Sequence, residues 1–284
     1  MWGFVRTFSL ICGVVVFLLG TAPASAEPSR IVSLNPCLDA VLVQVADRAQ
    51  IAAVSHYARD PHASSIADIA ADLPITYETA EEVIARSPDL VMTSRHSAIA
   101  TRNALARLGI KTILFDVPDT VAASQDQIRE VAALVGHPER GAALVDRIDQ
   151  ALAEAKPRSD APPLSAALIE PNGFSVGAET LSDELLRRTG FENVAARYGV
   201  GRSGLVPLEK LIANPPSVLF LGQPEGATPE WAERVVRHPA MRRLSGRVVR
   251  AEFPQKLMYC GGAVLIEGAS ILAQARLRAT AGAP

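Results

Sequence analysis

The sequence predicts an α/β protein with two mostly parallel-sheet lobes, joined by one long rigid helix and separated by a ligand cleft. Three observations support this fold class. A long amphipathic pattern runs from His137 to Lys156, and short apolar runs alternate with helix-like patterns on both sides of it. In addition, one helix-turn-strand pattern occurs once on each side, which suggests a repeated lobe. Alternating units of this length are typical of a parallel sheet with helices on its faces.

The pattern from His137 to Lys156 is that of a helix buried along one face. Its apolar residues recur at spacings of three and four, which places them on one side of a helix; they are Ala142, Leu144, Val145, Ile148, Ala151, Leu152 and Ala155. Pro138 suits a first helical turn, where its missing N–H costs no hydrogen bond, and Pro157 ends the pattern. We therefore expect an N-terminal lobe at 27–136, a linking helix at 137–157 and a C-terminal lobe at 158–284.

The first residues have the pattern of a secretory signal peptide. Arg6 precedes an apolar run from Phe8 to Gly20 that is too short to span a bilayer, and Ala24-Ser25-Ala26 provides the small residues of a cleavage site. We expect residues 1–26 to be removed and the remainder to be exported. Cys12 would be lost with this segment, which leaves Cys37 and Cys260.

The charge balance argues against a polyanionic partner. The chain carries 28 basic and 30 acidic residues, for a formal net charge of −2. There is no excess of positive charge to bind nucleic acid. We expect no nucleic-acid partner and a monomeric protein.

Strand and helix patterns follow one another along both lobes. Before the linking helix we expect strands at 31–34, 51–54, 90–92 and 112–115, with helices at 40–46, 81–86 and 101–108. After it we expect strands at 166–169, 218–221 and 247–251, with helices at 181–189 and 266–278. The repeated pattern runs from Glu81 to Val91 and again from Leu208 to Leu219. Each copy has an acidic residue, a short helix, a proline-containing turn and an apolar strand.

Polar and aromatic residues collect in the loops that follow the predicted strands. In an open parallel sheet, ligands bind at the carboxyl ends of the strands. The residues there are Asn35, Cys37, His56, Tyr57, Arg59, Arg95, His96, Asn172, Phe174, Tyr259 and Cys260. Tyr77 and Tyr198 also fall in predicted loops, so all four tyrosines do. Together they favour a cleft lined with aromatic rings.

The two remaining cysteines, Cys37 and Cys260, each follow a predicted strand, one in each lobe. Three arrangements compete: two buried thiols, a ligand contact, or a disulfide across the cleft. A disulfide requires Cα atoms within about 7 Å. We expect buried or cleft-lining thiols, because a bond between the lobes would limit the exchange of a ligand.

Motifs for catalysis and for metal binding are sparse. Residues 173–177 match the G-x-S-x-G pattern of a nucleophile elbow, and Asp183 and His238 would complete a triad with Ser175. A secreted serine hydrolase is therefore the alternative from another functional class, although Pro171-Asn172-Gly173 breaks the strand that an elbow requires. The five histidines are scattered and no pair has helical ligand spacing, so we assign no metal-binding residue.

Several short motifs, in their order along the chain, resemble the class III periplasmic solute-binding proteins of ABC importers, which include cobalamin, ferric-siderophore and haem receptors. The similarity extends from Arg30 to the last helix. Its motifs are Arg30-Ile31-Val32-Ser33-Leu34-Asn35-Pro36, Val54-Ser55-His56-Tyr57, Ser87-Pro88-Asp89-Leu90-Val91 and Thr180-Leu181-Ser182-Asp183-Glu184-Leu185-Leu186. Cys37-Leu38-Asp39 stands where the family often has Thr-Glu. Together with Cys260-Gly261-Gly262, it marks a divergent subgroup.

The resemblance implies a receptor that is not an enzyme and has no catalytic residues or cofactor. It would work in the periplasm and deliver a cobalt- or iron-containing chelate to an ABC permease at the inner membrane. Cobalamin or a ferric siderophore is the expected ligand, with haem or a bare metal ion as alternatives. Tyr57, Tyr77, Phe174 and Tyr259 would supply apolar faces, and Arg95, Arg59 and Lys256 would meet anionic groups. Glu81 and Glu209, one on each lobe, would dock onto the permease.

Overall fold

A computed structural model describes residues 2–3, 27–158, 161–170, 172–222, 238–244 and 246–281. The expected signal peptide at 1–26, apart from Trp2 and Gly3, lies outside the described residues. Across the described ranges, no helix combines the length and the apolar character that crossing a bilayer requires.

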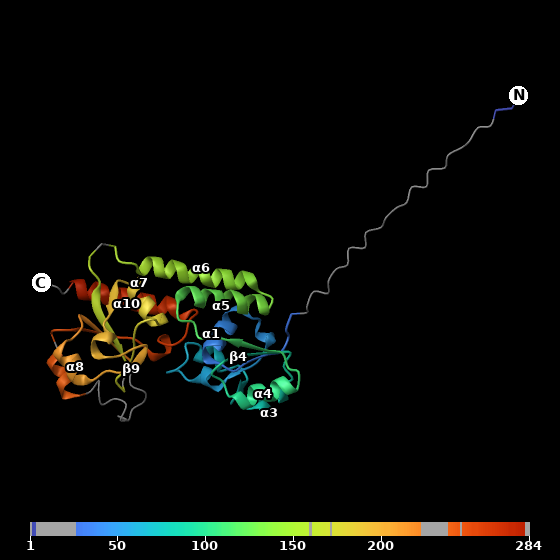
Figure 1. Cartoon of the computed structure of the whole chain (residues 1–284), viewed down its shortest axis with the longest axis horizontal. Coiled ribbons are helices and arrows are strands. Elements are labelled where there is room, and N and C mark those ends of the chain that lie inside the picture. Colours follow the sequence, from blue (N-terminus) through green and yellow to red (C-terminus); the bar gives the residue numbers. More distant parts are fainter. Residues whose placement is uncertain are drawn as a thin grey trace.

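The strands form two separate sheets, one on each side of the molecule (Figure 1). The N-terminal sheet is entirely parallel, with the order β3-β2-β1-β4-β5. Its strands are β1 (Ile31–Ser33), β2 (Ile51–Ser55), β3 (Ile75–Thr76), β4 (Leu90–Ser94) and β5 (Thr112–Phe115). The second sheet has the order β11-β10-β6-β7-β9, with β8 also paired to β6. Its strands are β6 (Leu164–Ile169), β7 (Phe174–Val176), β8 (Phe191–Asn193), β9 (Ser203–Leu205), β10 (Val218–Leu221) and β11 (Val249–Glu252).

Both sheets are mainly parallel, as the alternating sequence pattern predicts. In the second sheet only β7 runs against its neighbours β6 and β9. The α-helices are α1 (Pro36–Val45), α2 (Ala67–Ala70), α3 (Ala80–Ala85), α4 (Ile99–Arg107), α5 (Val121–Leu134), α6 (Pro138–Ala155), α7 (Leu181–Arg188), α8 (Leu208–Ala213) and α10 (Val264–Ala281). The two-lobed α/β fold is therefore confirmed.

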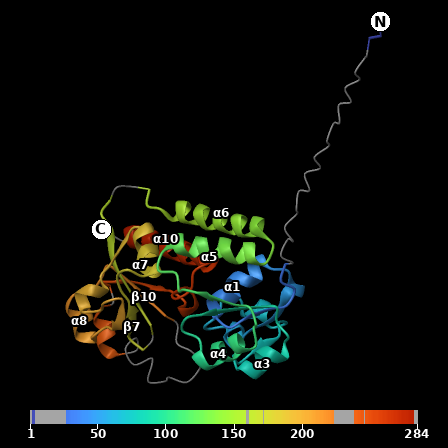
Figure 2. The same ribbon diagram turned by 45° about the vertical axis from the view of Figure 1, so that its right-hand side comes forward.

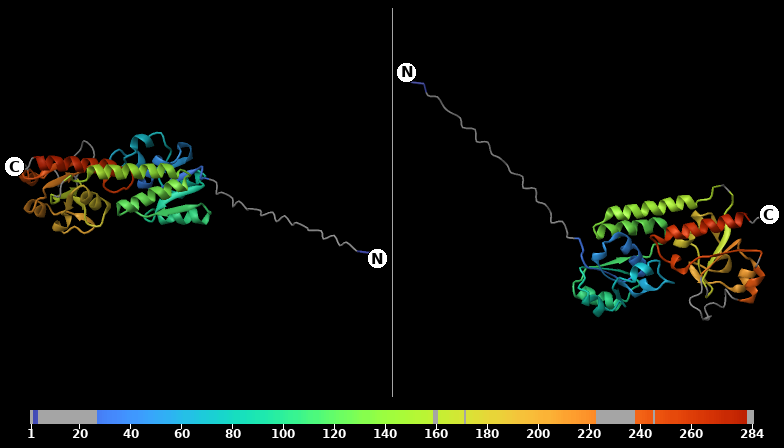
Figure 3. Two further views of the ribbon diagram at one scale, coloured as in Figure 1. Left: turned by 90° about the horizontal axis from the view of Figure 1, so that it is seen from above. Right: turned by 180° about the vertical axis from the view of Figure 1, so that it is seen from behind.

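Helix α6 comes between the strands of the two sheets in the chain. In space it lies over the N-terminal lobe and reaches the C-terminal lobe at one end (Figure 3). Its buried side chains include Leu144, Val145, Ile148 and Leu152, which lie on one face as the spacing predicts. This face packs against α5 and α10, and Figure 2 shows α5, α6 and α10 together above the gap between the sheets. One hydrophobic cluster runs through these helices and into both sheets. The boundaries at 27–136, 137–157 and 158–284 stay a prediction.

The repeated sequence pattern corresponds to one structural unit in each lobe. Helix α3 leads into β4, which pairs with β1, the first strand of its sheet. Helix α8 leads into β10, which pairs with β6, the first strand of the other sheet. Glu81 and Glu209 are each the second residue of their helix, so they occupy equivalent positions in the two lobes.

Candidate functional site

The carboxyl ends of the N-terminal strands face the C-terminal lobe. Cys37, just after β1, is bonded to Cys260 of the second lobe. After β5, the backbone N–H of Val121 donates to Glu184 Oε2 of α7 at 2.8 Å. Because the carboxyl ends of parallel strands share one edge of a sheet, the loops after β2, β3 and β4 lie on this edge too. The candidate ligand site lies where this edge meets the C-terminal lobe.

An aromatic stack, made of His56, Tyr57 and Tyr77, lies at this edge of the N-terminal sheet. His56 and Tyr57 begin a short 3₁₀ helix directly after β2, and Tyr77 directly follows β3. The His56 ring lies 3.9 Å from the Tyr57 ring and 4.8 Å from the Tyr77 ring, centroid to centroid. Tyr57 and Tyr77 are 48% and 64% exposed. Both tyrosines are therefore more exposed than is usual for a large aromatic residue, as expected of residues that line a ligand site; we call this stack the aromatic wall.

Ile99 is an exposed apolar residue of the same lobe that sequence reasoning did not identify. Thr101 Oγ1 donates to the backbone oxygen of Glu78 at 2.9 Å, which brings the start of α4 beside the residue after Tyr77. Ile99, the first residue of α4, is 66% exposed. Burial raises the pKa of the neighbouring Glu78, and the charge of His56 opposes that shift. Ile99 could not be predicted from the sequence, because a single exposed apolar residue at the start of a helix belongs to no periodic pattern or motif.

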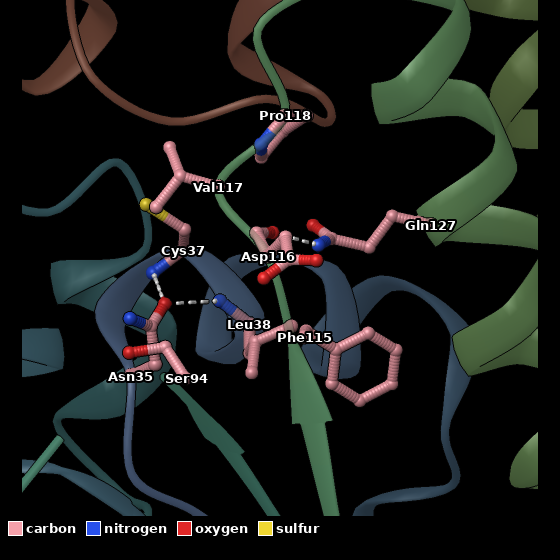
Figure 4. Close-up of a pocket in the computed structure, with 9 residues that line it drawn as sticks. All are labelled: Asn35, Cys37, Leu38, Ser94, Phe115, Asp116, Val117, Pro118 and Gln127. Atoms are coloured by element: carbon pink, nitrogen blue, oxygen red, sulfur yellow. Dashed lines mark hydrogen bonds between the residues drawn. The ribbon is translucent and has the colours of Figure 1, made fainter. Parts of the chain in front are cut away.

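Asn35 and Cys37 meet in a small hollow at the same edge (Figure 4). The hollow is lined by Asn35, Cys37, Leu38, Ser94, Phe115, Asp116, Val117, Pro118 and Gln127. Asn35 is the N-cap of α1, and its side-chain oxygen accepts hydrogen bonds from the N–H groups of Cys37 and Leu38 at 3.0 and 3.2 Å. The side-chain oxygen is therefore occupied by the N–H groups at the start of α1, as expected of an N-cap. Only its amide nitrogen is left to meet a ligand.

The expectation of free thiols at Cys37 and Cys260 is wrong, because the two form a disulfide with Cα atoms 5.1 Å apart. Cys37 is the second residue of α1, and Cys260 lies in the loop before α10. That loop packs against α1 and α5, which brings the two side chains together although they are 223 residues apart in the chain. The bond joins the first turn of α1 to the loop before α10, so it links the two lobes covalently.

Two predicted cleft residues, Arg59 and Arg95, have other partners. Arg59 donates to the backbone oxygens of Ala70 and Leu73 at 3.1 and 2.7 Å, so it stabilises its own loop. Arg95 forms an exposed ion pair with Asp116. His96, beside it, is exposed, and Lys256 is half-buried.

Tyr198 does not line a cleft either. It is 1% exposed and its hydroxyl donates to the backbone oxygen of Asn214 at 2.8 Å. Burial raises its pKa to about 12. Of the four tyrosines, Tyr198 is therefore a core residue, while Tyr57, Tyr77 and Tyr259 are partly exposed.

An apolar pair on β7 and β9 offers a second wall, in the C-terminal lobe. Phe174 is paired with Leu205 in the register of these antiparallel strands, so their side chains lie on one face of the sheet. Phe174 is half-buried and Leu205 is 68% exposed. Arg202, just before β9, bonds to Asp119 of the N-terminal lobe, so this edge lies at the junction of the lobes. Leu205 is a second residue that sequence reasoning missed.

The nucleophile-elbow interpretation of Ser175 is wrong. Ser175 is the central residue of β7 and is fully buried, whereas an elbow exposes its serine between a strand and a helix. Helix α7 begins only at Leu181. Asp183 is paired with Arg187 at 3.2 Å, and His238 accepts a hydrogen bond from the N–H of Ala240 at 3.1 Å. Neither residue is a partner of Ser175.

Glu81 and Glu209 are both exposed at the start of a short helix. Among the described residues, neither carboxylate has a hydrogen-bond or ion-pair partner. An acid in this position interacts favourably with the helix dipole. Both side chains are also free to meet a partner protein. Within the described ranges, no group of three or more His, Cys, Asp or Glu residues is placed to hold a metal ion.

Asp39, which sequence reasoning did not single out, is a fully buried acid behind the site. Its Oδ2 accepts hydrogen bonds from the hydroxyl and, at 3.1 Å, from the backbone N–H of Ser55, the last residue of β2. Its Oδ1 has no partner among the described residues. Burial raises the pKa of Asp39 from 3.8 to about 7, although the nearby Ser33 hydroxyl and the hydrogen bonds from Ser55 oppose the shift. Asp39 therefore holds the end of β2, and with it His56, in place.

Two lobes whose loops meet, with exposed aromatic rings at the strand ends, are an arrangement suited to binding a ligand between lobes. Residues 31–246 match the family model described as periplasmic binding protein. This match covers most of the chain, and the protein belongs to that family.

Similar proteins include receptors for several metal-containing ligands. A curated cobalamin-binding protein of Halobacterium salinarum is 24% identical over 203 residues, which are 69% of this chain and 54% of the relative. The chain thus spans about half the length of the curated relatives it matches. Among solved structures, the apo haem-binding protein RhuT of Roseiflexus has a TM-score of 0.69 at 21% identity, covering 88% of this chain and 98% of its own.

Two further structures have the same fold. CeuE of Helicobacter pylori with Ni(II) bound has a TM-score of 0.70 at 18% identity, covering 94% of this chain and 90% of its own. The vitamin B12 binding protein BtuF of Vibrio cholerae has a TM-score of 0.67 at 15% identity, covering 89% and 98%. At such identities these structures show the fold alone.

The buried carboxyl of Asp39 should make the protein less stable as pH rises. The unfolded chain releases this proton near pH 3.8, whereas the folded protein keeps it to about pH 7. Between these values the folded state binds more protons, so the unfolding free energy falls as pH increases. Asp39→Asn cannot ionise and keeps an acceptor for Ser55. Urea unfolding between about pH 5 and about pH 8 should show a shallower loss of stability for this variant than for the wild type.

The exposed Asp72 provides the control, because Asp72→Asn changes the same type of residue outside the core. This variant should reproduce the wild-type pH dependence. Equal slopes for wild type and Asp39→Asn would show that Asp39 stays ionised throughout and would contradict the prediction.

Proposed function

We propose that this protein is a periplasmic receptor that binds a metal chelate between its lobes and delivers it to an ABC importer. The observation that carries the proposal is the pair of exposed rings, Tyr57 and Tyr77, which flank the half-buried His56 at the carboxyl ends of β2 and β3. Stacked rings suit a ligand with a broad, flat, apolar face. The segment 1–26 is proposed as its cleaved export signal.

The apolar pair of the C-terminal lobe, Phe174 and Leu205, favours a ligand that is held between two apolar surfaces rather than one bound mainly by charged side chains. Phe174 and Leu205 offer apolar surface from the C-terminal lobe, and Ile99 adds to the N-terminal wall. The bound chelate would exchange water for apolar contact on both of its faces, which contributes roughly 25 cal/mol for each Å² buried. No step of covalent chemistry is required of these residues.

Among chelates, a corrinoid of the cobalamin type fits this edge best. Ferric siderophores and haem usually carry exposed negative groups and need free cations in the site. Here Arg59 is turned to backbone oxygens and Arg95 is paired with Asp116. Cyanocobalamin carries no net charge and depends less on such cations. Tyr259, 41% exposed beside the disulfide, would contact its edge.

Titration with cyanocobalamin should show one saturable site of about micromolar affinity or better. Leu205→Asp should weaken this binding about 10- to 100-fold, because an aspartate in place of a leucine would lose apolar contact and desolvate a charge. Isothermal titration calorimetry measures both constants. Haem, a ferric siderophore and free Co²⁺ or Fe³⁺ should bind more weakly.

The matched control is Leu277→Asp, because Leu277 on α10 is 68% exposed, as Leu205 is. Its affinity should stay within about twofold of the wild type, since surface changes away from a site have small effects. Tighter binding of another chelate would replace the corrinoid as ligand. Failure of every chelate, with binding of a free metal ion, would contradict the chelate proposal.

Glu81 and Glu209 support the second half of the proposal, delivery to a permease. They occupy equivalent positions in the two lobes, on α3 and α8, and both are exposed without a partner among the described residues. Two separated acids of this kind fit basic residues on the outer face of a membrane permease. Two charges on separate lobes orient a partner protein more than they add to the binding affinity.

Charge reversal at both positions, Glu81→Arg with Glu209→Arg, should abolish most ATPase stimulation of the cognate importer in liposomes. Exposed ion pairs are worth only about 0–1 kcal/mol, so the melting temperature and the ligand affinity should stay almost unchanged. Reversal of Glu192, an exposed acid on β8, serves as a control that keeps stimulation. Normal ATPase stimulation by the double variant would contradict the docking role and leave the two acids only their favourable interaction with the helix dipoles.

A further inference from the structure

The Cys37–Cys260 disulfide is a covalent link between the lobes. Cys37 belongs to α1 of the N-terminal lobe, and Cys260 lies between a 3₁₀ turn (Gln255–Leu257) that follows β11 and helix α10. Helices α1, α5 and α10 all pack against α6. The bond therefore joins the first turn of α1 to the loop that leads into α10, two of the helices that pack on α6. We take this helical side of the junction as the closed end of the space between the lobes.

The loop around Cys260 fits closely against three elements of the N-terminal lobe. A Cβ on Gly261 would lie 2.3 Å from Ser124 Oγ on α5 and 3.1 Å from Pro118 Cγ, so only glycine fits there. Gly262 has φ +85°, and a Cβ on it would lie 3.3 Å from Val41 Cγ2 on α1. Its N–H donates to Ser124 Oγ at 2.8 Å. Two glycines thus seat the Cys260 loop on the opposite lobe.

The other polar contacts between the lobes are weaker than a covalent bond. Arg202 and Asp119 are both about half exposed, and such pairs contribute little because water and salt screen them. The hydrogen bond from the Val121 N–H to Glu184 breaks whenever α5 and α7 separate. Ser182 Oγ donates to the backbone oxygen of Met258 at 2.6 Å, which ties the Cys260 loop to its own lobe. A displacement of that loop would therefore also displace α7, which carries Ser182.

We propose that the Cys37–Cys260 disulfide is a hinge tether, which lets the lobes tilt about one fixed point but prevents them from separating there. A fixed point at the closed end leaves rotation as the remaining motion, so opening occurs mainly at the aromatic wall. The tether would narrow the range of lobe positions in the free protein. Under the proposed function it would also slow ligand release, because release requires the lobes to part.

Distances between spin labels on the two lobes test the tether without any ligand. Ala106→Cys on α4 and Ala213→Cys on α8 place one label on an exposed helical site of each lobe. The protein is prepared without residues 1–26, which removes Cys12. An iodoacetamide spin label then reacts with the two introduced thiols alone, since Cys37 and Cys260 are bonded to one another. Double electron–electron resonance should give a narrow distance distribution. Cys37→Ser with Cys260→Ser should broaden it about twofold or more, because the hinge then loses its fixed point.

Ser124→Ala is the matched control, because it removes the hydrogen bond to Gly262 and keeps the disulfide. It should leave the distribution narrow. If the double serine variant does not fold, dithiothreitol reduction of the labelled native protein replaces it; the reagent converts the bond to two thiols and is itself oxidised to a cyclic disulfide. An unchanged width after loss of the bond would overturn the tether and leave a disulfide that serves stability alone.

Cyanocobalamin release gives a second readout, which rests on the proposed function. Stopped-flow dissociation from the double serine variant should be about tenfold faster than from the wild type. Equal release rates together with a broadened distribution would remove the effect on release but not the tether. Absence of binding by the wild type would contradict the proposed function, and the distance measurement would still decide the tether.

Discussion

The packing of the apolar face of α6 against α5 and α10 fixes the position of the two sheets relative to one another. Leu144, Ile148 and Leu152 join the hydrophobic cluster that continues into both sheets. The carboxyl edges of the sheets face one another because this cluster sets their relative position.

That constraint determines what each loop can do. Loops near the helices carry the contacts between lobes, including the disulfide and the hydrogen bond from Val121 to Glu184. Loops after β2 and β3 carry exposed rings instead. Asp39 connects these two regions. It lies on α1, and its carboxylate accepts hydrogen bonds from Ser55 at the end of β2. The buried acid thus connects the rigid part of the N-terminal lobe to the aromatic wall.

Patterns that depend on local spacing were predicted well from the sequence. The apolar spacing of α6 and the repeated helix-turn-strand units gave the two-lobed fold, and strand ends pointed to the edge with His56, Tyr57 and Tyr77. Contacts between distant residues were not predictable in this way. The Cys37–Cys260 bond depends on how a loop folds against α1 and α5, and the fate of Arg59 depends on two backbone oxygens nearby. Leu205 could be found only through its pairing with Phe174.

A crystal structure of the protein with cyanocobalamin tests the central claim most directly. We expect the corrin ring to lie between the His56–Tyr57–Tyr77 stack and the Phe174–Leu205 pair, with the disulfide intact beside it. A ring bound elsewhere on the surface would contradict the account. So would a structure in which the space between the lobes holds only a metal ion coordinated by side chains.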